Sequence, residues 1–556
     1  MEKRTLLAFV LSFAVIIGWS LIFTPQQSEF NKQTGPFDKE LLHRQPEELQ
    51  SPDLPQQNKA FDESLNTTRK TSSSIDQKDI IIDTPLYRAV FTNAGPTIRS
   101  FKLKKYFTNL SHDSEPIELV KFENDLENLL TIDFHDYSKD KKENLIYETN
   151  QTNINLRSDS PPKELVFHTI SPRGLLIKKT FCFFPDRYQI DIKFEITNQS
   201  DQTLKGSIIA QLKNLPPEEK HSYYSFIGFT LLLDNDLQEL KYKDDPAKND
   251  HQGLIDWIAY EDDYFISAIV PNVPVKSLFR GQILPGGILE GTYIQPSISL
   301  DKSQHHSTDF IFYMGPRDLT YLKEIGKKLE RSINFGWTDI IARPLLYMLR
   351  FFNTYINNYG ISIILLTILI KIFFWPLTHK SYQSMKEMQK LQPIMAKIRE
   401  KHKNDKQKMN AEIMGLYKTY KVNPMGGCLP MVVQIPVFFA LFRILGSTIE
   451  LRHASFMLWI NDLSAPDRLF NFPFEIPFMT SPSGIPILTL LMGASMFIQQ
   501  KMTPAPGDPT QAKMMMFLPV IFTFMFINFP SGLVLYWLIN NLLSIAQQYR
   551  IYKKSR

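Results

Sequence analysis

The sequence predicts a polytopic α-helical membrane protein, with six transmembrane helices, that carries a large antiparallel β-sandwich outside the membrane. Segregated charge, six apolar stretches and a long region of short alternating strands predict this fold class. Residues 5–340 hold 37 Lys and Arg against 47 Asp and Glu, whereas residues 341–556 hold 23 against 9. An acidic, soluble-looking block is therefore fused to a basic, strongly apolar one.

Residues 1–23 are predicted to form an N-terminal transmembrane anchor. The apolar run from Leu6 to Phe23 is long enough for a bilayer about 30 Å thick, and Lys3 and Arg4 before it favour a cytoplasmic N-terminus. A cleaved signal peptide is the alternative, but the end of the run offers no small-x-small cleavage site. Residues 24–78 are rich in Gln, Pro and Ser and predict a flexible tether.

Residues 79–315 predict the β-sandwich domain. In the stretch Tyr188–Ile196, apolar residues alternate with polar or charged ones, which is the pattern of a half-buried strand. Turn clusters separate this stretch from similar runs, which indicates an antiparallel sandwich. The other predicted strands are Ile80–Ile82, Leu86–Phe91, Leu165–Ile170, Leu175–Phe184 and Ser207–Leu212.

No catalytic, metal or nucleotide site is predicted. Glu261-Asp262-Asp263 and His305-His306 are expected to be solvated loop residues, because neighbours in a strand point to opposite faces and no third ligand has a suitable spacing. The chain has no phosphate-binding glycine loop, HExxH or GxSxG motif, and its two cysteines exclude a disulfide scaffold. We therefore expect no enzyme activity, no cofactor and no metal.

Residues 316–358 predict two helices at the membrane surface. Apolar residues recur every three or four positions from Leu319 to Ile333, with lysines between them, as in an amphipathic helix. Residues 337–355 mix Trp, Tyr and Phe with two arginines, which is typical of a helix in the membrane interface. A buried core helix is the alternative for this second segment.

Five further spans are predicted in residues 359–556, at 360–377, 429–446, 485–498, 514–528 and 532–547. The loop charges agree with this count. Residues 378–424 carry 11 Lys and Arg against 4 acids, whereas residues 447–484 carry 2 against 4. The positive-inside rule then places both termini in the cytoplasm and residues of about 24–340 outside it.

Lys371 is the most informative residue, because a lysine within a span is costly and usually faces a wet cavity or a functional path. Snorkelling to the headgroups is the alternative. Polar residues on several spans could line a groove around this charge, although they could instead be hydrogen-bonding contacts between helices. These candidates are Thr367, four residues before Lys371, together with Gln434, Ser495, Tyr536, Trp537, Asn540 and Ser544.

The cytoplasmic segment 378–424 predicts an antiparallel helical hairpin, because apolar residues recur at helical spacing on both sides of Lys403–Lys406. Its methionines suit varied apolar partners, and its basic residues suit anionic lipid or ribosomal RNA. A simple solvated face is the alternative. The predicted contact residues are Met385, Met388, Lys390, Met395, Lys397, Arg399 and Met409.

Several motifs of the apolar half resemble the YidC-type membrane protein insertases of Gram-negative bacteria. The resemblance covers residues 360–550, and the β-domain matches the family's supersandwich only in architecture. It implies a five-helix insertase core in residues 359–556. The matching motifs are Gly360–Ile364, Trp375–Thr378, Leu391–Pro393, Lys421–Pro430, Leu458–Ser464 and Phe529–Tyr536.

The resemblance further implies a chaperone and insertase of nascent inner-membrane proteins that acts without nucleotide, alone or with the Sec translocon and its accessory subunits. Implied partners are the ribosome, the signal recognition particle with its receptor, and membrane lipids. The family's groove has an arginine where Lys371 stands and commonly a tyrosine at Trp537, so bidentate pairing and a hydroxyl contact are lost. A secondary transporter or channel, and a sugar-binding module on a membrane stalk, are the alternatives.

Overall fold

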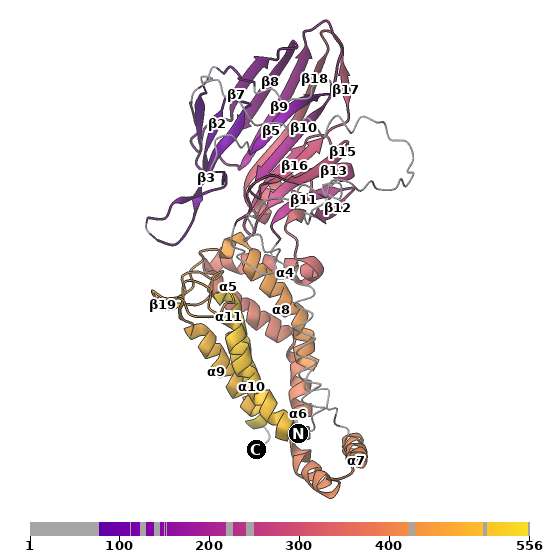
Figure 1. Ribbon diagram of the computed structural model, residues 1–556. Coiled ribbons are helices and arrows are strands. Elements are labelled where there is room, and N and C mark those ends of the chain that lie inside the picture. Colours follow the sequence, from indigo (N-terminus) through magenta and orange to yellow (C-terminus); the bar gives the residue numbers. More distant parts are fainter. Residues whose placement is uncertain are drawn as a thin grey trace, which may run out of the picture.

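The computed structural model describes residues 77–553, apart from residues 112, 123–128, 138–144, 150, 152, 218–225, 241–249, 421, 423–428 and 504–508. The predicted anchor (1–23) and nearly all of the predicted tether (24–78) lie outside the described residues. The described chain forms a β-rich part, which ends near residue 316, and a helical part that follows it (Figure 1).

The β-rich part consists of two sheets. The smaller sheet has five strands in the order β4-β3-β2-β1-β6, and the larger has 13 strands. The path of the larger sheet is β17-β10-β16-β15-β13-β14-β18-β9-β8-β7, with β5 on β10 and β11–β12 on β13. The strands are β1 (Asp79–Asp83), β2 (Tyr87–Thr92), β3 (Thr97–Phe107), β4 (Pro116–Glu118), β5 (Leu130–Asp136), β6 (Asn153–Asn155), β7 (Lys163–Ile170), β8 (Leu175–Phe183), β9 (Gln189–Asn198), β10 (Leu204–Asn214), β11 (Gly228–Leu233), β12 (Asp236–Glu239), β13 (Asp250–Glu261), β14 (Phe265–Pro271), β15 (Lys276–Ile283), β16 (Leu289–Ile294), β17 (Ile298–Leu300) and β18 (His305–Pro316).

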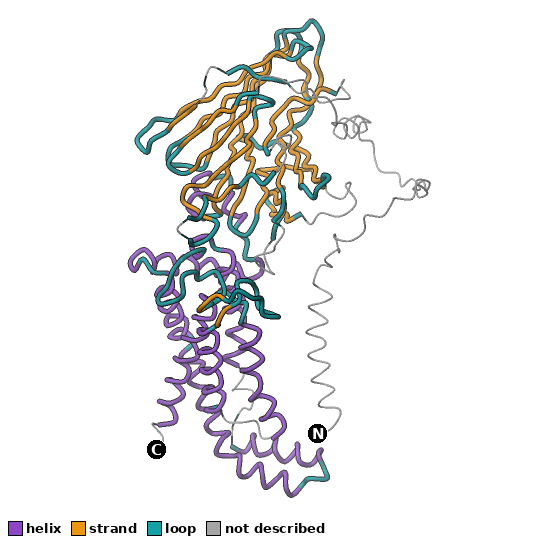
Figure 2. Tube along the Cα trace, turned by 60° about the vertical axis from the view of Figure 1, so that its left-hand side comes forward, coloured by secondary structure: helices purple, strands orange, loops and turns teal. Residues whose placement is uncertain are grey.

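The core of the domain lies between the two sheets, as in a sandwich (Figure 2). The ring of Phe91 in the smaller sheet packs edge-on against Phe181 and Phe183 in the larger one, at centroid distances of 5.2 and 5.5 Å. Alternation positions these rings, because β2 and β8 bury every second residue. The predicted pairing is antiparallel throughout, whereas β1 and β6 pair in parallel.

The expectation that Glu261 and Asp263 are solvated is wrong, since both side chains are buried. Glu261 ends β13, and its Oε2 lies 3.2 Å from Nη2 of Arg317. Arg317 also donates to the carbonyl oxygens of Asp262 and Ser332. The local acidic run does not show that β13 carries Glu261 into the core. It also does not show that the basic partner, Arg317, stands 56 positions further along the chain. His305 and His306 were also expected in a loop, but they begin strand β18 and pair with Thr197 and Ile196 of β9; His305 is exposed and His306 half-buried.

We expect the β-domain to be more stable near pH 5 than near pH 8 because of Glu261. Burial raises the pKa of Glu261 from 4.5 to about 7, and the Arg317 guanidinium opposes this shift only in part. The folded state therefore binds a proton that the unfolded chain releases, and this contribution to stability is lost as the pH rises from 4.5 through 7. Thermal unfolding of the wild type and of Glu261→Gln should show a smaller pH dependence in the variant. An identical pH dependence would contradict the assignment.

A short helical segment links the two parts. It contains α3 (Leu319–Ile325), the 3-10 turns η2 (Leu329–Ser332) and η3 (Gly336–Thr338), and α4 (Asp339–Ile356). The single amphipathic helix expected from Leu319 to Ile333 is interrupted, because Gly326, Lys327 and Lys328 all take positive φ values and end α3. α4 buries Ala342, Leu345, Leu346 and Leu349 and exposes apolar residues on its other side, and its position in the membrane interface stays a prediction.

The helical part places all five predicted apolar segments in helices, with shifted bounds. These helices are α5 (Tyr359–Phe373), α6 (Trp375–Lys401), α7 (Lys406–Thr419), α8 (Leu429–Ser447), α9 (Ile487–Met502), α10 (Pro509–Phe526) and α11 (Ser531–Lys553). The loop before α9 contains the 3-10 turn η5 (Ile449–Leu451) and the strands β19 (Leu469–Asn471) and β20 (Gly484–Ile485). Within the described residues, no single helix is both long and apolar enough to cross a membrane. α5 and α6, which meet at a bend of 65°, are together long and apolar enough by length and composition alone.

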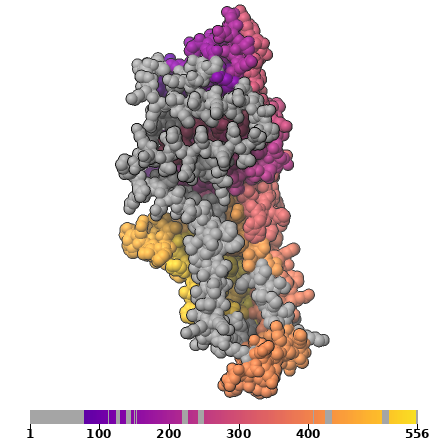
Figure 3. All heavy atoms as spheres, turned by 45° about the vertical axis from the view of Figure 1, so that its right-hand side comes forward, coloured from indigo at the N-terminus to yellow at the C-terminus, as the bar shows by residue number. Residues whose placement is uncertain are grey.

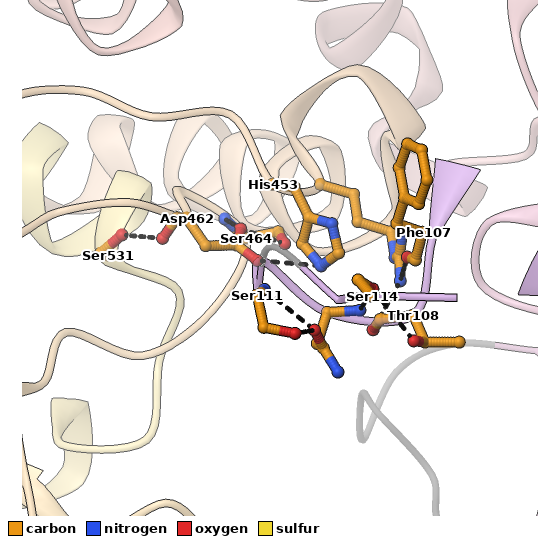
Figure 4. Close-up of polar contacts among 10 residues, drawn as sticks. Phe107, Thr108, Ser111, Ser114, His453, Asp462, Ser464 and Ser531 are labelled. Atoms are coloured by element: carbon orange, nitrogen blue, oxygen red, sulfur yellow. Dashed lines mark hydrogen bonds and ion pairs between the residues drawn. The ribbon is translucent and has the colours of Figure 1, made fainter. Parts of the chain in front are cut away.

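Ion pairs and backbone contacts join the two parts. Arg350 of α4 places Nη2 2.9 Å from Oδ1 of Asp318, the residue that caps α3, and 2.5 Å from Oε1 of Glu450 in η5. Nearby, Nη2 of Arg452 donates to the carbonyl oxygen of Phe107 at the end of β3, 2.8 Å away (Figure 4). The same close-up shows the Asp462 carbonyl oxygen, which accepts from Ser531 Oγ at the start of α11. The β-domain is thus tied to the loop between α8 and α9.

Candidate functional site: a polar pocket around Lys371

The pocket is built around the bend between α5 and α6. α5 begins where the Asn358 side chain accepts from the amide of Ile361, and it ends at Phe373, with Phe374 as the residue that caps it. Pro376 stands in the first turn of α6, where proline is tolerated because its missing N–H has no helical partner. The bend points the last turn of α5 and the first turn of α6 toward the same space, lined by Lys371, Phe374 and Thr378 among others.

Gly360 permits close contact between α5 and the loop after α8. A Cβ atom at this position would lie 2.0 Å from Cδ2 and 2.7 Å from Cβ of Phe456. We expect Gly360→Val to lower the free energy of unfolding by about 1–3 kcal/mol, because the overpacked side chain has no room. Gly415→Ala is the control, since nothing lies within 4 Å of its added Cβ. Thermal unfolding in detergent compares the two variants, and equal midpoints would contradict the contact.

Lys371 lies in the wall of a small, partly open pocket, whose about 290 Å³ of space not filled by protein atoms includes open solvent. Its side chain is 8% exposed, and Nζ donates to Oγ of Ser544 on α11 at 2.6 Å. In the described part of the chain, no carboxylate lies within ion-pair distance of this ammonium group. The lining residues come from α5, α6, α8 and α11 and are Ile370, Lys371, Phe374, Leu377, Thr378, Gln434 and Asn540.

Polar pairs between helices close the pocket. Gln434 of α8 donates through Nε2 to the hydroxyl of Tyr536 on α11 at 2.9 Å. Gln547 of α11 donates through Nε2 to Oγ1 of Thr378 on α6 at 3.0 Å. These pairs hold the pocket walls together, and they leave the ammonium group of Lys371 as the one charged group among the lining residues.

Of the predicted groove residues, Tyr536 and Ser544 do not line the pocket themselves but hydrogen-bond to the lining residues Gln434 and Lys371. Three others, Thr367, Ser495 and Trp537, neither line the pocket nor form such a bond to it. Thr367 is buried, and its Oγ1 donates to the Ile363 carbonyl oxygen of its own helix at 2.6 Å. Ser495 of α9 accepts from Nδ2 of Asn541 on α11, so it joins two helices elsewhere. Trp537 packs among aromatic rings of α8 and α10, with centroids 5.6 Å from both Phe438 and Phe526.

Thr378 and its neighbours were missed by the sequence reasoning. The segment from residue 378 was expected to belong to the cytoplasmic hairpin, so its first turn was not considered as a pocket wall. The available signal was the aromatic-proline pair Trp375-Pro376, because proline is favoured in the first turn of a helix and therefore marks a helix start. This signal places the break between the two helices before residue 377. Leu377 and Thr378 then belong to the first turn of α6, which lines the pocket.

The segment after the bend forms a helical hairpin at the far end from the β-domain (Figure 1). His402, which caps the end of α6, lies 3.0 Å from Glu412 of α7, and the Tyr417 hydroxyl donates to Sδ of Met395, so the two helices run antiparallel. Met385 and Met395 are buried, whereas Lys390 and Lys397 are exposed. Met388, Arg399 and Met409 are half-buried.

Fold and site together define a class: a protein with a polar, singly charged pocket inside an apolar helical part and with a large β-domain outside that part. The comparisons agree with this class. The family model described as 60Kd inner membrane protein matches residues 351–556, and the model described as YidC periplasmic domain matches residues 79–348.

Curated relatives match along the whole chain. The membrane protein insertase YidC of Syntrophobacter fumaroxidans is 41% identical over 563 residues, with 99% of both chains covered, and that of Syntrophus aciditrophicus is 40% identical over 564 residues, with 100% covered. A crystal structure of an active YidC insertase with its first transmembrane domain resolved covers 86% of this chain and 93% of its own, at 17% identity and a TM-score of 0.38.

This chain belongs to the YidC family of membrane protein insertases. The family resemblance predicted from the motifs is thereby confirmed. The chain is a multi-pass protein of the inner membrane with a periplasmic β-domain. Membership of a family of insertases also confirms the expectation that the chain is not an enzyme.

Proposed function

We propose that this chain inserts nascent proteins into the inner membrane through a groove whose charged centre is Lys371. One observation carries the proposal: a buried ammonium group in the apolar half of the chain faces a pocket and has a hydroxyl, Ser544, as its hydrogen-bond partner. Retaining a cation in such surroundings is costly, so intramembrane cations commonly mark a functional path. A structural lysine would be expected to have a carboxylate partner.

The pocket would lower the cost of moving polar client segments into the membrane. An uncompensated polar group pays a large desolvation penalty in an apolar medium. Gln434, Asn540 and Thr378 offer hydrogen bonds at the pocket wall, and Lys371 offers an ion pair to an acidic client segment. The apolar segment of the client would leave sideways into lipid, and Pro436 of α8 and Pro519 of α10 would allow these helices to deform. No nucleotide is required.

The wider topology is part of the same proposal. Six spans, with both termini in the cytoplasm and residues of about 24–340 on the periplasmic side, agree with the basic segment 378–424 and the acidic balance of residues 447–484. In this orientation the β-domain and the hairpin lie on opposite sides of the membrane, as their positions at opposite ends of the helices suggest (Figure 1).

The hairpin is the proposed docking site for cytoplasmic partners. Exposed Lys390 and Lys397 suit ribosomal RNA and anionic lipid headgroups, whereas buried Met385 and Met395 are occupied in packing. Half-buried Met388 and Met409 could add apolar contacts. The ribosome, the signal recognition particle with its receptor, and the Sec translocon with its accessory subunits are the proposed partners.

Reconstitution tests the proposed function directly. Liposomes that contain only this purified protein should protect a small single-span client from external protease, without nucleotide. Empty liposomes are the control. A secondary transporter or channel that uses Lys371 is the remaining alternative, and it predicts solute flux without client protection. Absence of protection would overturn autonomous insertion.

A further inference from the structure

A loop rich in phenylalanine lies at the β-domain end of α9 and α10. We define the phenylalanine loop as residues 469–485, from β19 through β20. Phe470, Phe474 and Phe478 are 70%, 60% and 80% exposed, which is far more than aromatic residues usually show in soluble regions. In Figure 3, residues of this part of the sequence form a light-orange lobe that projects sideways from the molecule. The exposed rings are thus presented away from the protein core.

Two of these rings are held outward by unusual backbone conformations. Phe470 and Phe478 have φ values of +57° and +68°, in the left-handed region where bulky residues are rare. Asn528, after α10, fixes the second position: its Nδ2 donates to the Phe478 carbonyl oxygen at 2.8 Å, and its Oδ1 accepts from the Thr480 amide at 2.9 Å. Glycine would avoid this strain, so the sequence keeps a costly conformation that exposes an apolar ring.

The loop continues an exposed apolar surface of α10. α10 exposes residues spaced by one and four positions, so they share one helix face: Met516, Phe517, Val520, Ile521, Phe524 and Met525. The ring of Phe478 packs on Phe524 at a centroid distance of 5.9 Å. The surface therefore runs without a break from α10 onto the loop, at the level where the helices meet the periplasmic side.

Charge in the loop does not favour electrostatic binding. Glu475 is the one charged residue between residues 469 and 485. Arg468, just before the loop, donates to the carbonyl oxygens of Ile527 and Pro482. Its guanidinium therefore connects the loop to the segment that follows α10. Contact with a partner would therefore depend on apolar burial rather than on phosphate or acidic groups.

We propose that the phenylalanine loop inserts Phe470, Phe474 and Phe478 among the acyl chains of the periplasmic leaflet. The loop acts as a second membrane contact for the helical part, beside the spanning helices themselves. It rests on the inner-membrane location of the chain and not on the role of Lys371. Because apolar contact drives it, the insertion should occur in purely zwitterionic lipid and change little with salt.

Spin labelling of the full chain in zwitterionic liposomes tests the proposal. Single Phe470→Cys, Phe474→Cys and Phe478→Cys labels are introduced after Cys182 and Cys428 have been replaced by serine. Collisions with oxygen should exceed those with a water-soluble nickel chelate several-fold at all three sites. A label at Phe517→Cys provides the lipid-facing control, and Val273→Cys, 70% exposed in the β-domain, provides the aqueous control.

Each other outcome overturns the proposal. Labels that behave like Val273→Cys would show that the loop is in water. Labels protected from both reagents would show that protein covers the loop, for example a second copy of the chain. Replacing Phe470 or Phe478, whose backbones have positive φ values, could itself disturb the loop. Phe474 has no positive φ value, so the label at residue 474 still tests the proposal in that case.

Discussion

Insertion of clients with acidic leader segments is expected to fall about ten-fold or more when Lys371 is replaced by alanine, whereas clients with uncharged leaders should lose about two-fold at most. The first effect corresponds to losing one charge-assisted contact of about 1.5–3 kcal/mol, since about 1.4 kcal/mol is a factor of ten. The second effect is small because the polar wall of Gln434, Thr378 and Asn540 remains. Protease protection in liposomes measures both client classes.

Two further variants control this result. Lys371→Arg keeps the charge and should retain most of the activity on acidic leaders, although it changes the hydrogen-bond geometry. Lys390→Ala removes an exposed charge of the hairpin and should affect both client classes equally. An equal loss on both client classes for Lys371→Ala would contradict the electrostatic role of the lysine.

Arg350→Ala is expected to loosen the junction between the β-domain and the helical part. The guanidinium joins Asp318 and Glu450, and burial raises the pKa of Glu450 while Arg350 lowers it. Removing the arginine leaves two carboxyl groups facing each other in a partly buried site. We expect a loss of about 2–4 kcal/mol in the free energy of unfolding, discounted for residual exposure of the three side chains.

The matched control is Arg343→Ala in the same helix. Arg343 pairs with Asp339 at an i,i+4 spacing nearer the surface and also donates to the carbonyl oxygen of Ile333, so its removal should cost about 1 kcal/mol. Thermal unfolding in detergent and proteolysis of the linking segment compare the two variants. Similar midpoints for both variants would show that Arg350 is not the main connection at the junction.

The sequence predicted those parts of the fold that depend on local periodicity. The strand Tyr188–Ile196 and the segment 429–446 were found at nearly the residues that β9 and α8 occupy, because alternation and apolar length are local signals. Lys371 was also found, because a cation in an apolar run stands out without any tertiary information. Ser544 was predicted as a groove residue, but its hydrogen bond to Lys371 was not predicted.

Features that depend on contacts between distant residues were not found. Glu261 was placed in solvent because its partner Arg317 lies beyond five further strands, β14 to β18. Thr367 shares a helix face with Lys371, yet its hydroxyl bonds to its own backbone. Ser495 stands on α9, which contributes no lining residue, and it bonds to Asn541. Helical spacing cannot distinguish these cases, since a short hydroxyl side chain can bond within the helix from any face.

Contact between Asn540 and a client during insertion tests the central claim most directly. In a chain with Cys182 and Cys428 replaced by serine, Asn540→Cys should form a disulfide with a cysteine in the leader of a stalled client. Leu542→Cys lies two residues along α11 on an exposed face and is the control. The account predicts crosslinking at residue 540 that exceeds that at residue 542 several-fold. Equal or reversed crosslinking would show that clients do not pass through the Lys371 pocket.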